Sequence, residues 1–390
     1  MGYGCFAGED GGDKKLTSHL PIIALCAMFV CVPLAISPIL YRYVLLPKLL
    51  AFYVCGAILA LSAWVSRRKS RDISWPLFVW GGVVCLSYFF RLDAGYPALH
   101  EAGFMISLVY FAVLVSLLSL DELHPVWWTA TITGFAVALI GICQHWDRLA
   151  FIPQSAAPAA TFGNRNLCAE YLICCIPVAV GLWWERRSRT LLVLAMAAMG
   201  VLLVLIGCRA AGLGLGFALF VILLRYVKRW YLLLALGVAV SLIFCIGVFF
   251  PSSPRKSASI QDRLTLWRGT VEMISDHPIL GVGPAAWFRE YPRYQPDAVY
   301  FQNPHNDYLW IAAEYGLVGL SAWLWMLAQT FRRLWRMSGM GRYLCASLAG
   351  LCVVALFGFP KESPATMMWM WTIIGVARCT PDSSSPFSSS

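Results

Sequence analysis

Charged residues are scarce in this chain of 390 residues, where only 13% are Asp, Glu, Lys or Arg and 59% are hydrophobic. A soluble domain carries about twice that charged fraction. The apolar residues fall in blocks of roughly 17–22, close to the length that a helix needs to cross a bilayer. The longest stretch without such a block is about 55 residues, too short for a large independent core. The composition therefore excludes a soluble globular enzyme and predicts an all-α, polytopic membrane helix bundle.

Paired cysteines and metal-ligand clusters are missing as well. Most of the 14 cysteines lie inside the apolar blocks, and the loops that we place outside contain none. This pattern favours buried cysteines acting as small hydrophobic residues over a disulfide framework or a zinc site. The chain also lacks a P-loop and any tight group of Asp, Glu, His or Cys at metal-ligand spacing. We expect no cofactor, no metal site and no dependence on ATP.

The positive charge, formally +10, is concentrated in short loops between apolar blocks. Four basic clusters fall on one side of a model with about twelve spans, and the positive-inside rule places that side, with both termini, in the cytoplasm. The net charge therefore reflects topology, and we expect no nucleic acid partner. The clusters lie at 67–71, 186–189, 225–229 and 332–342. The predicted spans are 20–40, 44–65, 74–90, 102–120, 126–146, 167–184, 190–207, 210–226, 230–250, 307–330, 342–359 and 364–377.

This topology divides the chain into three parts. Residues 1–19 form a cytoplasmic N-terminal segment and residues 20–377 the transmembrane domain. Residues 378–390 form a low-complexity cytoplasmic tail that we expect to be disordered. The outer loops are 91–101, 147–166 and 251–306.

Residues 251–306 form the largest outer loop, and we expect short helices in it. Asp262 is predicted to cap the start of an amphipathic helix that ends at Pro278. The aromatic residues of this loop favour two roles equally: an anchor at headgroup level, or a platform on which sugar rings stack. The predicted apolar face consists of Leu264, Trp267, Val271 and Ile274.

The densest polar cluster of the chain is NPHNDYLWIAAEYGLVGL, residues 303–320. Asn306 or Asp307 is predicted to cap the next span, which places His305 at its mouth on the outer face. Glu314 lies two turns, or about 10 Å, below Asp307 on the same face, and a carboxylate at that depth usually faces a cavity or a partner. His305 titrates near neutral pH, so it is a candidate general base. The alternative is a histidine that only satisfies the loop.

A second cluster, TFGNRNLCAEYL at residues 161–172, places Arg165 and Asn166 before a helix and Glu170 one turn inside it. An arginine at a helix N-terminus is electrostatically unusual, because that end attracts anions. A bound anion accounts for Arg165, and a headgroup contact does so equally well.

Two further clusters add arginines to the same face. Arg209 lies in GCRAAGLGLG, residues 207–216, at the turn between two spans. Arg263 and Arg268 lie in the segment 262–283. The planar fork of an arginine suits phosphate oxygens, although an arginine at a helix end also snorkels to the headgroups.

The motifs FGNRNLCAEYL, GCRAAGLGLG, DHPILGVG and HNDYLWIAAEYGLVGL resemble those of the O-antigen ligase family of membrane glycosyltransferases. The resemblance implies a glycan donor carried on undecaprenyl diphosphate, an acceptor hydroxyl on lipid A–core or another glycan, and an active site that faces the periplasm from the bacterial inner membrane. It also implies that His305 is the essential loop histidine, Arg209 the arginine of the short Gly-x-Arg turn and Arg263 the arginine that opens the helix of the large loop. Cys208 departs from the small residue usual before Arg209.

On this resemblance, we predict His305 and Arg209 as catalytic residues. The predicted substrate-binding residues are Arg263, Arg165, Asn166, Glu170, Asn306, Asp307 and Glu314. An O-antigen or exopolysaccharide polymerase of the same family remains an alternative, since it differs mainly in the acceptor. Protein O-oligosaccharyltransferases, a third branch of the family, rank lower, because they often carry an added C-terminal external domain, which we do not predict here.

A secondary transporter of an anion is the alternative from another class. Intramembrane Glu170 and Glu314, together with Arg209, fit an ion path. Transporters usually combine related repeats with helices broken at the midplane, and we predict neither in this chain.

Overall fold

The computed structural model describes most of the chain, and every regular element in its described ranges is helical, as the composition predicts. The described ranges are 10–40, 42–68, 75–91, 95–149, 151–155, 157–185, 189–225, 231, 237, 254–295 and 301–378. The longer helices are α1 Asp10–Leu34, α2 Leu45–Val65, α3 Trp75–Phe89, α4 Gly95–Ser116, α5 His124–His145, α6 Arg165–Trp184, α7 Arg189–Ile206, α8 Arg209–Leu224, α10 Pro254–Asp276, α12 Asp307–Arg336, α13 Met340–Val354 and α14 Pro364–Val376. The short ones are η2 Asp121–Leu123, α11 Trp287–Glu290, η3 Tyr291–Arg293 and η4 Pro360–Glu362.

Each predicted span overlaps a helix, apart from 230–250, almost all of which lies outside the described residues. α4 begins at Gly95, so most of the predicted outer loop 91–101 is helical. α1 begins at Asp10, well before the predicted start at residue 20, and ends at Leu34. The tail beyond Arg378 also lies outside the described residues.

Six of the described helices are long and apolar enough to cross a membrane: α2, α4, α5 with η2, α6, α7 and α12. Four other apolar segments are shorter, namely Ser18–Leu34, α3, α8 and α13. These helices make the chain a multi-pass membrane protein, while the count of about twelve spans stays a prediction.

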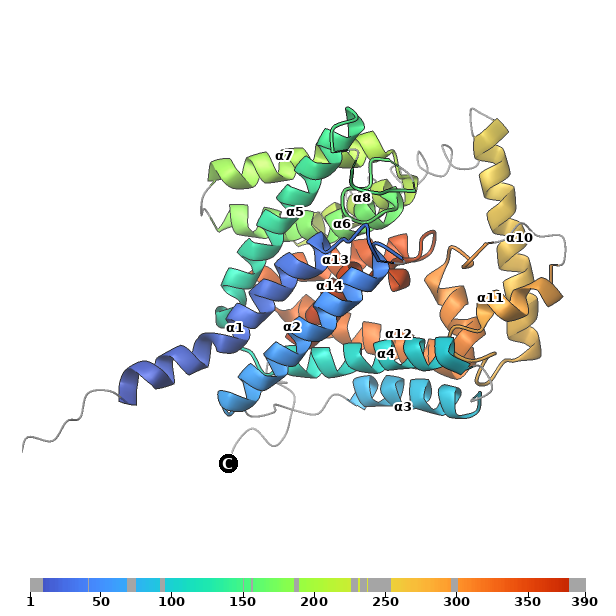
Figure 1. Cartoon of the computed structure of the whole chain (residues 1–390), viewed down its shortest axis with the longest axis horizontal. Helices are drawn as coiled ribbons and strands as arrows, with labels where there is room; N and C mark the ends of the chain where they lie inside the picture. Colours follow the sequence, from blue (N-terminus) through green and yellow to red (C-terminus); the bar gives the residue numbers. More distant parts are fainter. Residues whose placement is uncertain are drawn as a thin grey trace, which may run out of the picture.

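Helix α14 lies at the centre of the bundle (Figure 1). Every residue from Pro364 to Val376 is buried, and the indoles of Trp369 and Trp371 are completely covered. A helix that is apolar on all sides is stable only when other helices surround it. α4, α6, α2 and α13 supply that cover.

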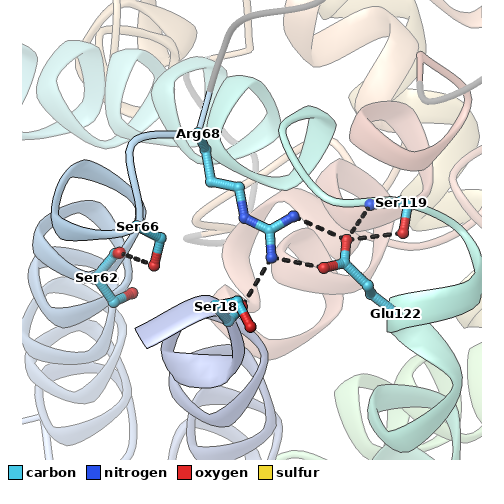
Figure 2. Close-up of polar contacts among 6 residues, drawn as sticks. All are labelled: Ser18, Ser62, Ser66, Arg68, Ser119 and Glu122. Atoms are coloured by element: carbon cyan, nitrogen blue, oxygen red, sulfur yellow. Dashed lines mark hydrogen bonds and ion pairs between the residues drawn. The ribbon is translucent and has the colours of Figure 1, made fainter. Parts of the chain in front are cut away.

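One end of the bundle is joined by an ion pair between segments far apart in the sequence (Figure 2). The guanidinium of Arg68, which follows α2, lies 2.5 Å from a carboxylate oxygen of Glu122 in η2. It also donates to the carbonyl of Ser18 in α1, at 2.8 Å, while Ser119 donates to the same carboxylate. The predicted topology places all four residues on the cytoplasmic side, and we call this end of the bundle the Arg68 end.

Two further contacts join helix ends that the topology also places on that side. Arg225, at the end of α8, donates to the carbonyl of Trp335 near the end of α12 and lies over its ring. His124, which begins α5, lies 3.3 Å from the carboxylate of Glu185 after α6. The alternation of helix ends in the structure therefore agrees with the alternation predicted from charge.

At the opposite end, which carries His305, side chains donate to the backbone carbonyls where α1 ends. The ammonium of Lys48 in α2 donates to the carbonyls of Val32, Pro33 and Ala35, where α1 ends. Thr161, before α6, donates to the carbonyl of Pro33 at 2.6 Å. These contacts satisfy carbonyls that have no partner within α1. We call this end the His305 end.

Helix α12 is interrupted at Gly316, where the backbone has φ 69° and ψ −176°. The prediction that no span is broken is therefore wrong. The turn 277–283, part of the DHPILGVG motif, fills the interruption and uses the backbone groups that the break releases. Its hydrogen bonds with α12 are Val282 N to Ala313 O (2.8 Å), Gly283 N to Glu314 O (3.0 Å) and Leu317 N to Pro278 O (2.8 Å). Groups released by a break inside a membrane must be satisfied by protein in this way.

Replacing Gly316 by alanine is expected to lower the free energy of unfolding by roughly 2–6 kcal/mol. The positive φ disfavours any side chain with a Cβ, and a Cβ at this position would overlap the carbonyl of Ile279. Gly200→Ala in α7 is the matched control, because nothing lies within 4 Å of its Cβ position. Thermal unfolding of the purified variants in detergent measures both, and equal midpoints would contradict the packing described.

Helix α10 extends across the His305 end of the bundle, beside the start of α12 (Figure 1). It has 23 residues and begins at Pro254, so Asp262 lies inside it and the predicted cap at Asp262 is wrong. It ends at Asp276, before Pro278, as predicted.

The buried face of α10 differs from the predicted one. Leu266, Thr270 and Met273 are completely or almost completely buried, whereas Leu264 and Val271 are about half exposed. Trp267 and Ile274 are partly buried, so the prediction holds for only half of its stripe. The buried face also includes the polar Thr270, whose hydroxyl accepts a hydrogen bond from the indole of Trp287.

The two largest buried aromatic residues of the outer loop form a small core under α10. The rings of Trp287 and Tyr291 stack with centroids 4.4 Å apart, and both residues are buried. The Trp287 indole donates to the hydroxyl of Thr270, and the Tyr291 hydroxyl donates to the carbonyl of Thr265. These two rings therefore support α10, and neither is the exposed sugar platform considered from the sequence.

Candidate functional site

The candidate site lies at the His305 end, where several chain segments meet. The segment 301–306, which we call the His305 loop, leads into α12. α10 packs against α12. Residues 355–363, which include η4, connect α13 with α14, and we call them the α13–α14 loop.

His305 is held in an unusual backbone conformation, with φ 52°. Its N–H donates to the side-chain oxygen of Asn303 at 3.1 Å. Its ring lies between Phe301 and Phe359, with centroids 6.0 and 5.0 Å away. Nδ1 is buried and has no hydrogen-bond partner among the described residues. A left-handed backbone at a non-glycine residue is costly and is often found at functional sites.

The residues on either side of His305 fix the direction of the loop. Asn306 caps α12, since its side chain accepts from the N–H groups of Tyr308 and Leu309 at 3.0 and 3.1 Å. This confirms the predicted cap. On the other side, the indole of Trp267 in α10 donates to the carbonyl of Pro304 at 2.9 Å.

Arg263 and Arg209 lie within electrostatic range of this loop. Burial, together with the positive charge of Arg263, lowers the pKa of His305 to about 4. Burial also lowers the pKa of Arg263, and the charge of Arg209 adds to that effect. His305 and the two arginines therefore form a chain of electrostatic neighbours, which is what a site for an anionic substrate requires.

Three of the predicted carboxylates are buried and bind the α13–α14 loop. Glu314 lies 2.5 Å from the ammonium of Lys361. Asp307 accepts from the backbone N–H of Lys361 at 2.9 Å, so Asp307 and Glu314 do share one face of α12. Glu170 in α6 accepts from the N–H of Phe359 at 3.4 Å. Their partners are thus protein groups that adjoin His305.

Residues 194–324 match a family model described as O-antigen ligase. This region is an O-antigen ligase domain. The match confirms the predicted resemblance over this third of the chain, and it supports the function of an O-antigen ligase-like or polymerase-like membrane glycosyltransferase in general. No match was found among curated proteins.

The O-antigen ligase domain extends from α7 into α12 and contains Arg209, Arg263 and His305. Asn306, Asp307 and Glu314 also lie inside it, in the same turn and helix as His305. These positions agree with the motifs that carried the resemblance, and the roles predicted for the residues stay predictions.

Arg165, Asn166 and Glu170 precede the O-antigen ligase domain. Helix α6 begins at Arg165, which is exposed, and Asn164 caps it by accepting from the N–H of Asn166 at 2.8 Å. Glu170 is almost completely buried. Of these three residues, Glu170 contacts a segment that packs on His305.

The α13–α14 loop contributes residues that the sequence analysis missed. Lys361 binds two acidic residues, and Glu362 accepts from the amide of Asn303 at 2.9 Å. One signal was available in the sequence, since a lysine in FPKES on the predicted outer side is unusual under the positive-inside rule. Among the described residues, no group of three or more His, Cys, Asp or Glu could hold a metal ion.

Proposed function

We propose that this protein transfers a glycan from an undecaprenyl diphosphate carrier to a hydroxyl of lipid A–core. The observation that carries the proposal is that α10, which bears Arg263, binds the carbonyl beside His305 through Trp267, inside an O-antigen ligase domain that also contains Arg209. A histidine supplies a base for the acceptor hydroxyl, and two arginines suit a diphosphate leaving group.

The chemistry needs only these groups and the activated donor. His305 takes the proton of the acceptor hydroxyl while the hydroxyl oxygen bonds to the anomeric carbon. The bond from that carbon to the diphosphate oxygen breaks, and Arg209 and Arg263, with Arg165, take up the developing negative charge. Attack opposite the leaving group inverts the anomeric centre. Because the leaving group is already activated, neither ATP nor a metal ion is required.

A groove along the bundle supports a lipid-linked donor. It has a volume of about 430 Å³ and is lined mainly by apolar side chains of α8, α12 and α13. Tyr308 and Trp335 both line the groove. Tyr308 is three residues from His305, whereas Trp335 lies near the other end of α12, towards the Arg68 end. An isoprenoid chain in this groove would place its diphosphate beside the arginines.

We place the His305 end at the periplasmic face of the inner membrane. The support is the distribution of basic clusters, which the positive-inside rule assigns to the cytoplasm together with the Arg68 end. In this orientation, the arginines of the site meet donors that have already been carried across the membrane.

Transfer by the purified protein tests the proposal. The protein in detergent is given a lipid-diphosphate glycan and either lipid A–core or a glycan acceptor. Product on lipid A–core supports the ligase, and product on the glycan alone supports the polymerase. Accumulation of a labelled anion in proteoliposomes without any transfer would favour the transporter and reject the proposal.

The pH dependence of transfer is expected to have its acid limb near pH 4, well below that of an ordinary histidine. The neutral form of His305 is the base, and its lowered pKa keeps that form dominant down to about pH 4. Activity should therefore stay level from pH 8 to about 5 and fall as the pH drops through 4. Arg263→Gln removes one cause of the lowered pKa, so the limb should move upward. We would measure kcat/KM for the donor, and a limb at pH 6.5 in the unmodified protein would contradict the assignment.

A further inference from the structure

Lys361 is a buried cation at a junction of four segments. Only 5% of the surface of Lys361 is exposed, although Lys361 lies in a loop. The ammonium lies 2.5 Å from Glu314 in α12, 3.1 Å from Glu101 in α4 and 4.1 Å from the centre of the Trp310 ring. Burial alone would lower the pKa of Lys361, but the carboxylates of Glu101 and Glu314 raise it, so the side chain stays charged.

The residues beside Lys361 contact the candidate base. Two positions before it, Phe359 packs on the ring of His305 with centroids 5.0 Å apart. One position after it, Glu362 accepts from the amide of Asn303 at 2.9 Å, and Asn303 in turn accepts from the N–H of His305. The α13–α14 loop therefore forms one wall of the His305 site and holds the backbone of His305 through Asn303.

Lys361 attaches this wall to α12 and α4. Its backbone N–H donates to Asp307, and its side chain binds Glu314 two turns further along α12. The bond to Glu101 adds α4 to the same anchor. A buried ammonium with two carboxylate partners fixes the geometry around it more tightly than an apolar side chain would, because each partner becomes an uncompensated group if it moves away.

We propose that Lys361 is a positioning residue for glycan transfer, which sets the α13–α14 loop so that Phe359 and Glu362 hold His305 in its reactive place. Lys361 itself does not contact the reacting atoms. The inference rests on the proposed function, because it requires His305 to act as the base.

Lys361→Met is expected to lower kcat by about 10²-fold, the loss that a displacement of a catalytic group by about 1 Å produces. Binding of a lipid-diphosphate donor should be unchanged, because Arg209 and Arg263 do not depend on this anchor. Lys361→Arg keeps the charge and should restore part of the rate. The measurements are single-turnover transfer and donor binding by the purified, folded protein.

Lys48 provides a matched control. It is a second buried lysine, 1% exposed, whose ammonium binds carbonyls of α1 and lies over Phe162. Lys48→Met should lower the thermal midpoint and leave kcat of the folded protein unchanged. An equal loss of kcat in both variants would overturn the proposal, since a general loss of packing would then explain it.

Glu101→Gln keeps the test decisive if Lys361→Met does not fold. Glu101 is partly exposed, with 20% of its side chain accessible, so the change should be tolerated. It removes one charge from the anchor and should lower kcat by a smaller factor, again with donor binding unchanged. If Lys361→Met does not fold, a wild-type kcat in folded Glu101→Gln would overturn the proposal.

The double variant Lys361→Met/His305→Ala separates the inference from the proposed function. If Lys361 acts through His305, the double variant should have the residual rate of His305→Ala alone. A further 10²-fold loss would overturn the positioning role. If the unmodified protein transfers no glycan, the proposed function fails. If His305→Ala keeps the wild-type rate, His305 is not the base and the inference fails with that assignment. If only Lys361→Met keeps the wild-type rate, the inference fails and the proposed function stands.

Discussion

Replacing His305 by alanine is expected to lower glycan transfer by about 10²–10⁴-fold, the usual contribution of a general base. The variant should still be produced and inserted, because the loop is held mainly by side chains other than the imidazole. Asn306 caps α12, and Trp267 binds the carbonyl of Pro304. The remaining rate should come from the arginines and the bound donor. Transfer by equal amounts of purified protein measures the loss.

His277→Ala is the control for this experiment. His277 lies in the same outer loop and within the O-antigen ligase domain, but it belongs to the turn that fills the interruption in α12. Its described hydrogen bonds use only the backbone. The control should keep the wild-type rate. A wild-type rate in His305→Ala, with correct folding, would show that His305 only completes the loop.

Replacing Arg209 by glutamine is expected to lower transfer by about 10²–10³-fold, because one donor to a developing charge contributes roughly 3–4 kcal/mol. Arg209 begins α8, close enough to Arg263 for its charge to lower the pKa of that residue. A diphosphate bound by both arginines would offset the repulsion between their two positive charges. Arg209→Lys should recover only part of the rate, since an ammonium does not bind two oxygens in a plane.

Arg268→Gln is the matched control for Arg209. Arg268 lies on α10 with 81% of its side chain exposed, and it pairs with Glu272 at 3.5 Å on the same helix. An exposed pair of this kind contributes little. The control should bind donor and transfer glycan normally. Equal losses in both variants would indicate that the overall charge of the face matters and that no specific phosphate site exists at Arg209.

Much of the site was predictable because it depends on local sequence. Asn306 caps α12 through N–H groups two and three residues ahead, so the motif itself places His305 at the mouth of the helix. Lys361 was not predictable in the same way. Its partners, Glu101 and Glu314, lie on helices distant in the sequence, and no local pattern pairs them.

The errors on α10 and α12 have the same origin. The sequence predicted one apolar stripe on α10, whereas the buried surface is the one that packs with Trp287 and Tyr291, which no local pattern places there. Gly316 alone does not predict a break in α12, since glycine also occurs in continuous membrane helices. The break forms because the turn 277–283 supplies the hydrogen bonds that α12 gives up.

The sequence by itself determined that the chain is a helical membrane protein, and its basic clusters predict which helix ends share one side. An apolar segment in a bilayer must satisfy its own backbone, and only the helix does so locally. Only the tertiary structure decided how His305 is held and what supports it. The buried ammonium of Lys361, the wall carrying Phe359 and the turn inside α12 are contacts between distant segments, whose geometry exists only once the helices have packed.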